Sequence, residues 1–176
     1  MKQLLLNKIE NREIVVGVIG LGYVGLPLAV EKAKAGFKTI GFDEQEVKVK
    51  MVNEGHNYIG DVVDKDLKRL VEEGRLSATS DFSFIKDVDF IAICVPTPLD
   101  IHQEPDLSCV RESTKSISKY LTKNTMVVLE STTYPGTTEE LVKPILEEGS
   151  GLKCGEDFYL GFSPERVDPG NLIYKT

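Results

Sequence analysis

Cysteine is scarce in this chain, and its three copies are scattered along the sequence. Cys94, Cys109 and Cys154 form no C-x-x-C pair, and no nearby histidine would complete a metal site. We therefore expect no disulfide, no structural zinc and no other metal. Cys94 lies within the apolar run FIAICV, where a small buried side chain is the simplest interpretation. None of the three cysteines is assigned a chemical role.

Long apolar runs and an excess of positive charge are also missing. The N-terminal segment MKQLLLNKIENRE has only three consecutive leucines, too few for a signal peptide or a membrane span. The formal net charge is -7 at pH 7, and the basic residues are interleaved with acidic ones, which argues against nucleic-acid binding. We therefore expect one globular domain, located in the cytoplasm, that binds neither nucleic acid nor membrane.

What the chain does contain is a regular alternation of short apolar runs and helical patterns. Near-continuous Val, Ile and Leu are typical of strands buried on both faces of a parallel sheet. The expected strands cover 14–19, 37–42, 77–79, 89–95, 125–130 and 157–162, and the expected helices cover 23–35, 44–54, 64–73, 106–121 and 137–148. Gly36, Gly55, Gly74 and Gly149 are placed to end four of these helices. The order predicts an α/β fold, a doubly wound Rossmann-type parallel sheet with strand order 3-2-1-4-5-6.

This topology predicts where a ligand binds. Ligands of doubly wound sheets lie at the carboxyl ends of the strands, near the switch between strands 1 and 4. The loops after strands 1, 4, 5 and 6 should therefore converge, and all four are rich in Gly, Pro, Ser and Thr: GLGYVG, PTPLD, STTYPGTT and SPERVDPGN. The region 55–80 fits the scheme least well, because one helix more than the pattern requires precedes the third strand.

A dinucleotide-binding pattern follows the first expected strand. Gly20, Gly22 and Gly25 form G-x-G-x-x-G, in which the first glycine permits a tight turn, the second lets a pyrophosphate approach the backbone and the third lets the helix pack against the sheet. Asp43 ends the second strand 23 residues after Gly20, close to the spacing of a ribose-binding carboxylate. Such a carboxylate repels a 2′-phosphate, so the pattern favours NAD over NADP. The alternative is a plain turn in which Asp43 only caps the next helix.

Further motifs extend this match. GLGYVGLPLA, CVPTPL, EPDLS, ESTTYPGTTEE and FSPERVDPGN occur in this order. Together they resemble the nucleotide-sugar 6-dehydrogenases of the UDP-glucose and GDP-mannose dehydrogenase family. Within it, LESTTYPGTTEE followed by SPERVDPGN is most similar to the UDP-N-acetylglucosamine 6-dehydrogenases that serve bacterial surface polysaccharides. The resemblance implies two successive hydride transfers to NAD, which convert the C6 alcohol of a UDP-sugar to a carboxylate through an enzyme-bound thiol adduct.

The resemblance also implies roles for residues at the strand ends. Residues that would hold the adenosine and pyrophosphate are Gly20, Gly22, Tyr23, Val24, Asp43 and Lys48, and those that would line the nicotinamide half are Val95, Pro96, Thr97, Ser131 and Thr132. Thr132 and Glu165 match the positions that orient and activate the water of the hydrolytic step. Glu165, Arg166 and Val167 match substrate-facing positions.

These residues also have purely structural interpretations. Ser131 to Thr133 could cap the helix that begins near Gly136, and the PTP segment could be a stiff exit from its strand. Glu165 and Arg166 could form a surface ion pair.

The family places its catalytic cysteine, together with a lysine, an asparagine and an aspartate, beyond the first domain, and this chain ends at Thr176 before any of them. We therefore expect residues 1–176 to be the NAD-binding N-terminal part of a longer, homo-oligomeric enzyme, and to bind NAD without turnover. Two alternatives stay open: the Rossmann domain of another β-hydroxyacid-type dehydrogenase, and a non-catalytic NAD-binding module.

Overall fold

A six-stranded, all-parallel sheet forms the centre of the protein, whose computed structural model describes residues 2–99, 101 and 103–164. The strands are β1 (Val15–Ile19), β2 (Lys38–Phe42), β3 (Leu76–Thr79), β4 (Phe90–Ile93), β5 (Met126–Leu129) and β6 (Tyr159–Phe162). Their order is β3-β2-β1-β4-β5-β6, which confirms the predicted doubly wound topology. Every strand lies within its predicted range except β3, which begins one residue earlier at Leu76.

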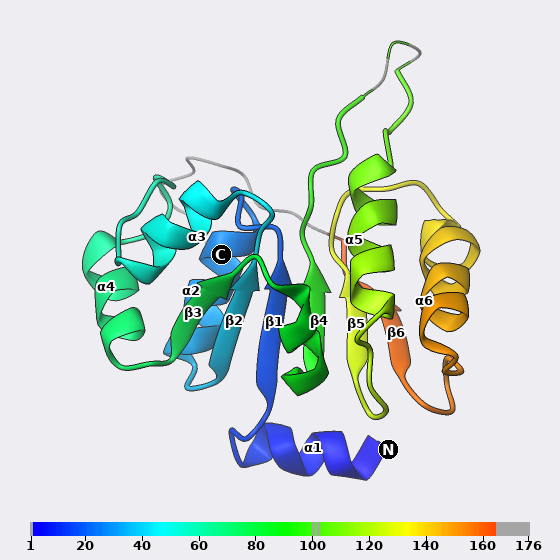
Figure 1. Ribbon diagram of the computed structural model, residues 1–176, viewed down its shortest axis with the longest axis horizontal. Coiled ribbons are helices and arrows are strands. Elements are labelled where there is room, and N and C mark those ends of the chain that lie inside the picture. The colour runs from blue at the N-terminus through cyan, green and yellow to red at the C-terminus, as the bar shows by residue number, and fades with distance from the viewer. Residues whose placement is uncertain (1, 100, 102, 165–176) are drawn as a thin grey trace.

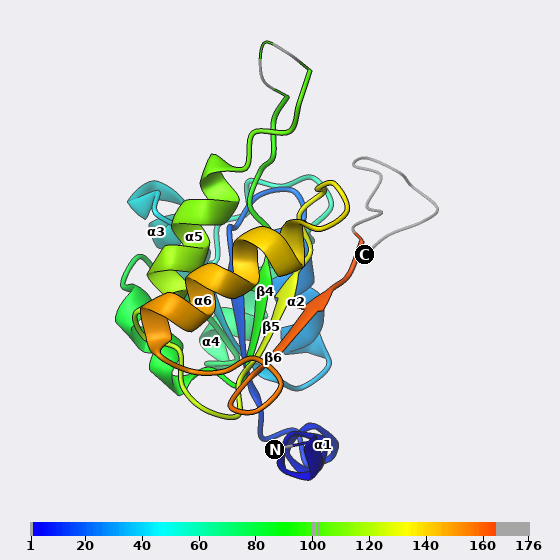
Figure 2. The ribbon, with the colours of Figure 1, turned by 90° about the vertical axis from the view of Figure 1, so that its right-hand side faces the viewer.

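Helices cover both faces of the sheet (Figures 1 and 2). Side chains of α2 (Gly25–Lys34), α3 (Glu46–Asn53) and α4 (Asp64–Glu72) pack in one hydrophobic cluster, and those of the 3-10 helix η1 (Phe82–Asp87), α5 (Ser108–Ser118), the π-helix η2 (Thr138–Val142) and α6 (Lys143–Ser150) pack in another. Successive side chains of a strand point to opposite faces. Accordingly, Val16 and Val18 of β1 pack in one hydrophobic cluster, and Ile19 packs in the other.

Three of the four helix-ending glycines follow their helices as predicted, and one does not. Gly36, Gly55 and Gly74 have φ angles of 95°, 71° and 69°, in the left-handed region that glycine adopts readily. The prediction for Gly149 is wrong, because α6 continues to Ser150 and ends on Gly151, at φ 71°. A Cβ on Gly149 would collide with the Ser118 side chain, so this glycine allows α5 and α6 to pack closely.

The sequence prediction contains neither α1 (Lys2–Glu10) nor η1. Helix α1 lies across the amino ends of the strands, on the side away from the strand ends predicted to bind a ligand (Figure 1). Lys8 Nζ donates a 2.6 Å hydrogen bond to Asp89, and Leu5 is buried. A nine-residue helix is marginal on its own, so these tertiary contacts stabilise it. No helix within residues 2–99, 101 and 103–164 is long and apolar enough to cross a membrane.

The region between β2 and β3 holds two helices, as expected, and a side chain of one closes the edge of the sheet. Asn53 Nδ2 donates to the Ala78 carbonyl at 2.9 Å, and the Ala78 N–H donates to Asn53 Oδ1 at 2.8 Å. This pair satisfies both backbone groups of Ala78 on the outer strand, and an edge covered in this way is protected from pairing with another chain.

Candidate dinucleotide-binding site

The turn from β1 into α2 requires glycine at two positions for reasons internal to the protein. Gly20 has φ 90°, and a Cβ there would lie 2.8 Å from the carbonyl oxygen of Cys94. A Cβ on Gly25 would overlap the Gly20 carbonyl. Cys94 itself is buried at the end of β4, which confirms its structural interpretation. The turn therefore packs directly onto the end of the neighbouring strand.

Gly22 differs from the other two glycines of the pattern, because no atom of the described residues, apart from its two chain neighbours, lies within 4 Å of the position that its Cβ would occupy. Contacts within the described part of the chain therefore do not explain a glycine here. The open space is where a ligand can approach the backbone at the amino end of α2, which follows Tyr23 and the N-cap residue Val24. The free amide groups and dipole of such a helix end favour an anion such as a pyrophosphate.

Asp43 is buried, with 8% of its surface exposed, and its carboxylate connects three segments. Oδ2 accepts hydrogen bonds from the Leu21 N–H at 2.9 Å and from Lys48 Nζ at 3.3 Å, and Oδ1 accepts one from the Gln45 N–H at 2.9 Å. The N-cap of α3 is Gln45, without a side-chain capping bond, so Asp43 shapes the turn before the helix and does not cap it. The carboxylate thus lies beside the glycine turn, as the fingerprint requires.

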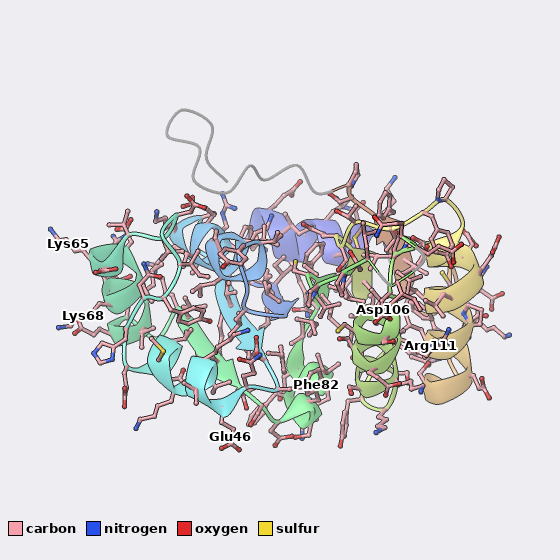
Figure 3. All side chains as sticks on the ribbon, turned by 90° about the horizontal axis from the view of Figure 1, so that it is seen from above. Glu46, Lys65, Lys68, Phe82, Asp106 and Arg111 are labelled. Atoms are coloured by element: carbon pink, nitrogen blue, oxygen red, sulfur yellow. The ribbon has the colours of Figure 1, made fainter. Side chains whose placement is uncertain are left out.

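A cavity of about 320 Å³ opens at the carboxyl ends of β1 and β2, next to the start of α5. Its lining residues are Ile19, Gly20, Phe42, Asp43, Glu44, Gln45, Lys48, Phe82, Val95, Pro96, Ser108, Cys109, Glu112 and Ser113. Five of the predicted cofactor residues therefore meet in one space. Figure 3 shows Phe82 between the segment that carries Glu46 and helix α5. The rings of Phe42 and Phe82, with centroids 5.6 Å apart, give this space an apolar wall suited to a planar base.

Sequence reasoning did not identify the residues that η1 and α5 contribute to this cavity. Phe82 lies in a short 3-10 helix with no recognisable periodicity, so nothing in the sequence marked it. Ser108 is the last residue of the motif EPDLS and Cys109 directly follows it, but the resemblance assigns a role to neither residue.

The loops after β4 and β5 are joined by hydrogen bonds between predicted site residues. Ser131 Oγ donates to the Val95 carbonyl at 2.7 Å, and Thr97 Oγ1 donates to the Thr132 carbonyl at 2.7 Å. Ser131 therefore bonds back to the β4 loop and does not cap the following helix, whose N-cap, Thr137, has no side-chain capping bond. Both loops are held at the same edge of the sheet as the glycine turn.

The structure places the predicted residues in two adjoining groups and leaves three undescribed. Gly20, Gly22, Tyr23, Val24, Asp43 and Lys48 surround the β1–α2 turn, and Val95, Pro96, Thr97, Ser131 and Thr132 follow β4 and β5. Glu165, Arg166 and Val167 lie outside the described residues.

One further residue reaches the glycine turn without having been predicted. Tyr58, from the loop between α3 and α4, donates its hydroxyl hydrogen to the Leu21 carbonyl at 2.8 Å. Burial, together with the nearby charge of Asp43, raises the pKa of the Tyr58 phenol above its ordinary value. The phenol therefore stays protonated and remains a donor. It belongs to the region 55–80, where the sequence pattern was least regular.

This arrangement agrees with comparisons to known proteins. Residues 14–176 match the family model "UDP-glucose/GDP-mannose dehydrogenase family, NAD binding domain". Protein CapL of Staphylococcus aureus is 43% identical over 164 residues, which cover 93% of this chain and 37% of that protein. The UDP-N-acetyl-D-glucosamine 6-dehydrogenase of Pseudomonas aeruginosa is 41% identical over 165 residues, covering 94% and 38%.

A solved structure agrees in fold as well as in sequence. The NDP-N-acetyl-D-galactosaminuronic acid dehydrogenase of Methanosarcina mazei superposes with a TM-score of 0.83 at 38% identity, over 94% of this chain and 38% of that one. The chain thus spans less than two fifths of the length of these relatives. Fold, glycine turn, carboxylate and comparisons agree, and the chain belongs to the UDP-glucose/GDP-mannose dehydrogenase family, of which it contains the NAD-binding domain.

Proposed function

We propose that residues 1–176 are the NAD-binding N-terminal part of a longer nucleotide-sugar 6-dehydrogenase. The full enzyme would oxidise the C6 alcohol of a UDP-N-acetylhexosamine to a carboxylate, with reduction of two NAD, in the synthesis of a surface polysaccharide. Two relatives support this substrate class, because the Pseudomonas aeruginosa and Methanosarcina mazei proteins are both named as dehydrogenases of N-acetylated nucleotide sugars. Assembly of the full enzyme as a homo-oligomer stays a prediction.

The observation that carries the cofactor part of this proposal is the contrast between Gly22 and the other two glycines. Gly20 and Gly25 are explained by contacts within the protein, whereas Gly22 faces open space and directly follows Leu21, whose N–H donates to Asp43. A residue without a side chain, next to open space and to a helix amino end, fits a bound pyrophosphate. Asp43 would accept hydrogen bonds from the adenosine ribose, and Lys48 lies close enough to share that role.

NAD supplies a hydride acceptor when it is bound in this crevice. The residues of the β4 and β5 loops would orient its nicotinamide half, and the hydrogen bonds between Ser131 and Val95 and between Thr97 and Thr132 would keep these loops in place. Thr132 is exposed at this edge and would position a water molecule, with Glu165 as the base that activates it. Arg166 and Val167 would contact the sugar nucleotide.

Binding can be tested on residues 1–176 by calorimetry, and its place by thiol labelling. Cys109 lines the cavity and is exposed, Cys94 is buried, and burial raises the pKa of the Cys154 thiol, which slows its alkylation. We expect iodoacetamide to modify Cys109 first, as followed by mass spectrometry, and saturating NAD to slow that reaction at least fivefold. Cys109→Ser is the control that identifies the modified thiol. Cys109 labelling at the same rate with and without NAD would contradict this placement.

The enzymatic part needs a chain that continues into the downstream coding sequence. We expect such a protein to reduce two NAD for each UDP-N-acetylhexosamine, and residues 1–176 alone to give no appreciable turnover. Preference for a short hydroxyacid would instead indicate another β-hydroxyacid-type dehydrogenase. A stop codon directly after Thr176 in the intact gene would favour a non-catalytic NAD-binding module.

A further inference from the structure

We propose that Tyr58 is a positioning residue for dinucleotide binding, because it fixes the orientation of the Leu21–Gly22 peptide in the glycine turn. This inference rests on the proposed function, in which that turn receives the pyrophosphate. Leu21 is completely buried, and both of its backbone polar groups are held by side chains from elsewhere in the chain. Its N–H donates to Asp43 at 2.9 Å, and its carbonyl accepts from the Tyr58 hydroxyl at 2.8 Å.

The Tyr58 hydrogen bond fixes more than one carbonyl group. A peptide unit is planar and trans, so its C=O and N–H point in opposite directions. The unit that carries the Leu21 carbonyl also carries the Gly22 N–H. Holding the carbonyl on Tyr58 therefore directs the Gly22 N–H away from Tyr58, in one fixed orientation. A backbone N–H in this turn is the kind of group that binds a phosphate oxygen.

Without Tyr58, little in the turn itself would maintain this orientation. Rotation of the Leu21–Gly22 peptide changes ψ of Leu21 and φ of Gly22, and glycine tolerates nearly any φ. Gly22 also has no side chain of its own to resist this rotation, and among the described residues beyond its two chain neighbours no atom lies within 4 Å of its Cβ position. Because Gly22 has no side chain, its backbone is open to a ligand. For the same reason, the peptide before it can rotate easily. Tyr58 supplies the missing restraint.

The position of Tyr58 is itself built by its own loop. Asn57 accepts a hydrogen bond from the Ile59 N–H at 2.8 Å, and its Nδ2 donates to the carbonyls of Ile59 at 2.8 Å and Val62 at 2.7 Å. Ile59 and Val62 are buried in the hydrophobic cluster against which Tyr58 packs. A loop organised in this way presents the phenol in one place before any ligand arrives, which lowers the cost of ordering the turn upon binding.

The test compares two ligands on Tyr58→Phe, which keeps the ring and its packing but removes the hydroxyl. ADP-ribose contains the pyrophosphate, whereas adenosine contains only the base and ribose. Dissociation constants from NMR titration of residues 1–176 should rise about 5- to 10-fold for ADP-ribose, the range expected for one hydrogen bond, and less than twofold for adenosine. Tyr120→Phe, which removes an exposed hydroxyl next to the far end of α5, should change neither.

Amide hydrogen exchange gives a second readout that does not depend on a ligand. In Tyr58→Phe, the amide of Leu21, which donates to Asp43, should exchange at least several-fold faster, while amides in β1 keep their protection. Equal weakening of ADP-ribose and adenosine would show that Tyr58 acts only through general stability, and unchanged affinity for ADP-ribose would also overturn the inference. Failure of the unmodified chain to bind ADP-ribose or NAD would instead contradict the proposed function.

Discussion

At the residue scale, Asp43 holds the glycine turn in place and, in the proposed function, also binds the adenosine ribose. Its carboxylate accepts backbone hydrogen bonds from Leu21 and Gln45 and an ion pair from Lys48, so it organises the turn before any ligand binds. Each carboxylate oxygen has about two acceptor positions. Oδ2 uses both for Leu21 and Lys48, and Oδ1 uses one for Gln45. A ribose hydroxyl would therefore bond to Oδ1 or displace Lys48.

Replacing Asp43 with asparagine should separate the charge of this residue from its size. We expect Asp43→Asn to weaken NAD binding about tenfold or more, because hydrogen bonds to a charged acceptor are stronger than those to a neutral one. The preference for NAD over NADP should shrink at the same time, because the 2′-phosphate no longer meets a negative charge. Calorimetric titration with both cofactors measures this ratio.

The control for Asp43→Asn is Glu72→Gln, which removes a negative charge from an exposed position on α4. It should leave the affinities for NAD and for NADP within about twofold of the original, since salt screens the charge of an exposed side chain outside the site. An unchanged cofactor preference in Asp43→Asn would contradict the ribose-binding role.

At the scale of the element, the β1–α2 turn assigns a different physical requirement to each of its three glycines. Gly20 needs a positive φ, Gly25 needs the absence of a Cβ against a neighbouring carbonyl, and Gly22 needs neither. The G-x-G-x-x-G pattern shows glycine at all three positions and does not itself measure what each glycine contributes to stability or to binding. Substitution by alanine should do so.

We expect Gly22→Ala to fold at least as stably as the original chain, since alanine at an unstrained glycine position adds about 0.4–1 kcal/mol of stability. Its NAD affinity should fall more than tenfold, because the methyl group occupies the space reserved for the ligand. Gly25→Ala should instead lose about 3 kcal/mol of stability, at the upper end of overpacking costs, through its overlap with the Gly20 carbonyl. Thermal unfolding and calorimetry measure the two effects. Tight NAD binding by Gly22→Ala would argue against this approach of the pyrophosphate.

At the scale of the whole molecule, ionised carboxylates connect separate elements and make stability depend on pH. Lys34 of α2 bonds to Asp66 of α4 at 2.9 Å, and this hydrogen bond lowers the pKa of Asp66. The pKa values of four other carboxyls are lowered by hydrogen bonds from their neighbours: Asp81, Asp106, Glu112 and Asp157. A carboxyl whose pKa is lower in the folded state stabilises it above the unfolded pKa, near 4, and that contribution disappears as the pH falls further.

We therefore expect the unfolding temperature to decrease as the pH is lowered from 5 to 3. Asp66→Asn should unfold at a lower temperature than the original chain at pH 6, and the difference should narrow as the pH falls towards 3, because protonation of Asp66 progressively removes its charge from the original chain. Glu148→Gln, an exposed position on α6, serves as the control and should show no such convergence. Calorimetric scans across this range check the prediction. A constant difference between the two proteins from pH 6 to pH 3 would contradict it.

The sequence by itself determined the sheet order, the glycine turn, the carboxylate beside that turn and the family. These features depend on local chemistry: apolar runs with a strand period, a φ angle that only glycine adopts easily, and a carboxylate at a fixed distance along a βαβ unit. Gly149 shows the limit of such reasoning. Its position after a helical pattern looked like a helix end, but its neighbour in space is Ser118, which lies far away along the chain.

Only the tertiary structure decided which residues from outside the motifs complete the site. Phe82 and Cys109 reach the cavity, and Tyr58 reaches Leu21, from segments whose local patterns carry no sign of these contacts. Each of them is far from the glycine turn in sequence, and folding of the sheet brings it next to the turn or the cavity. A contact of this kind depends on how helices and loops pack around the strand ends, and packing is a property of the whole chain.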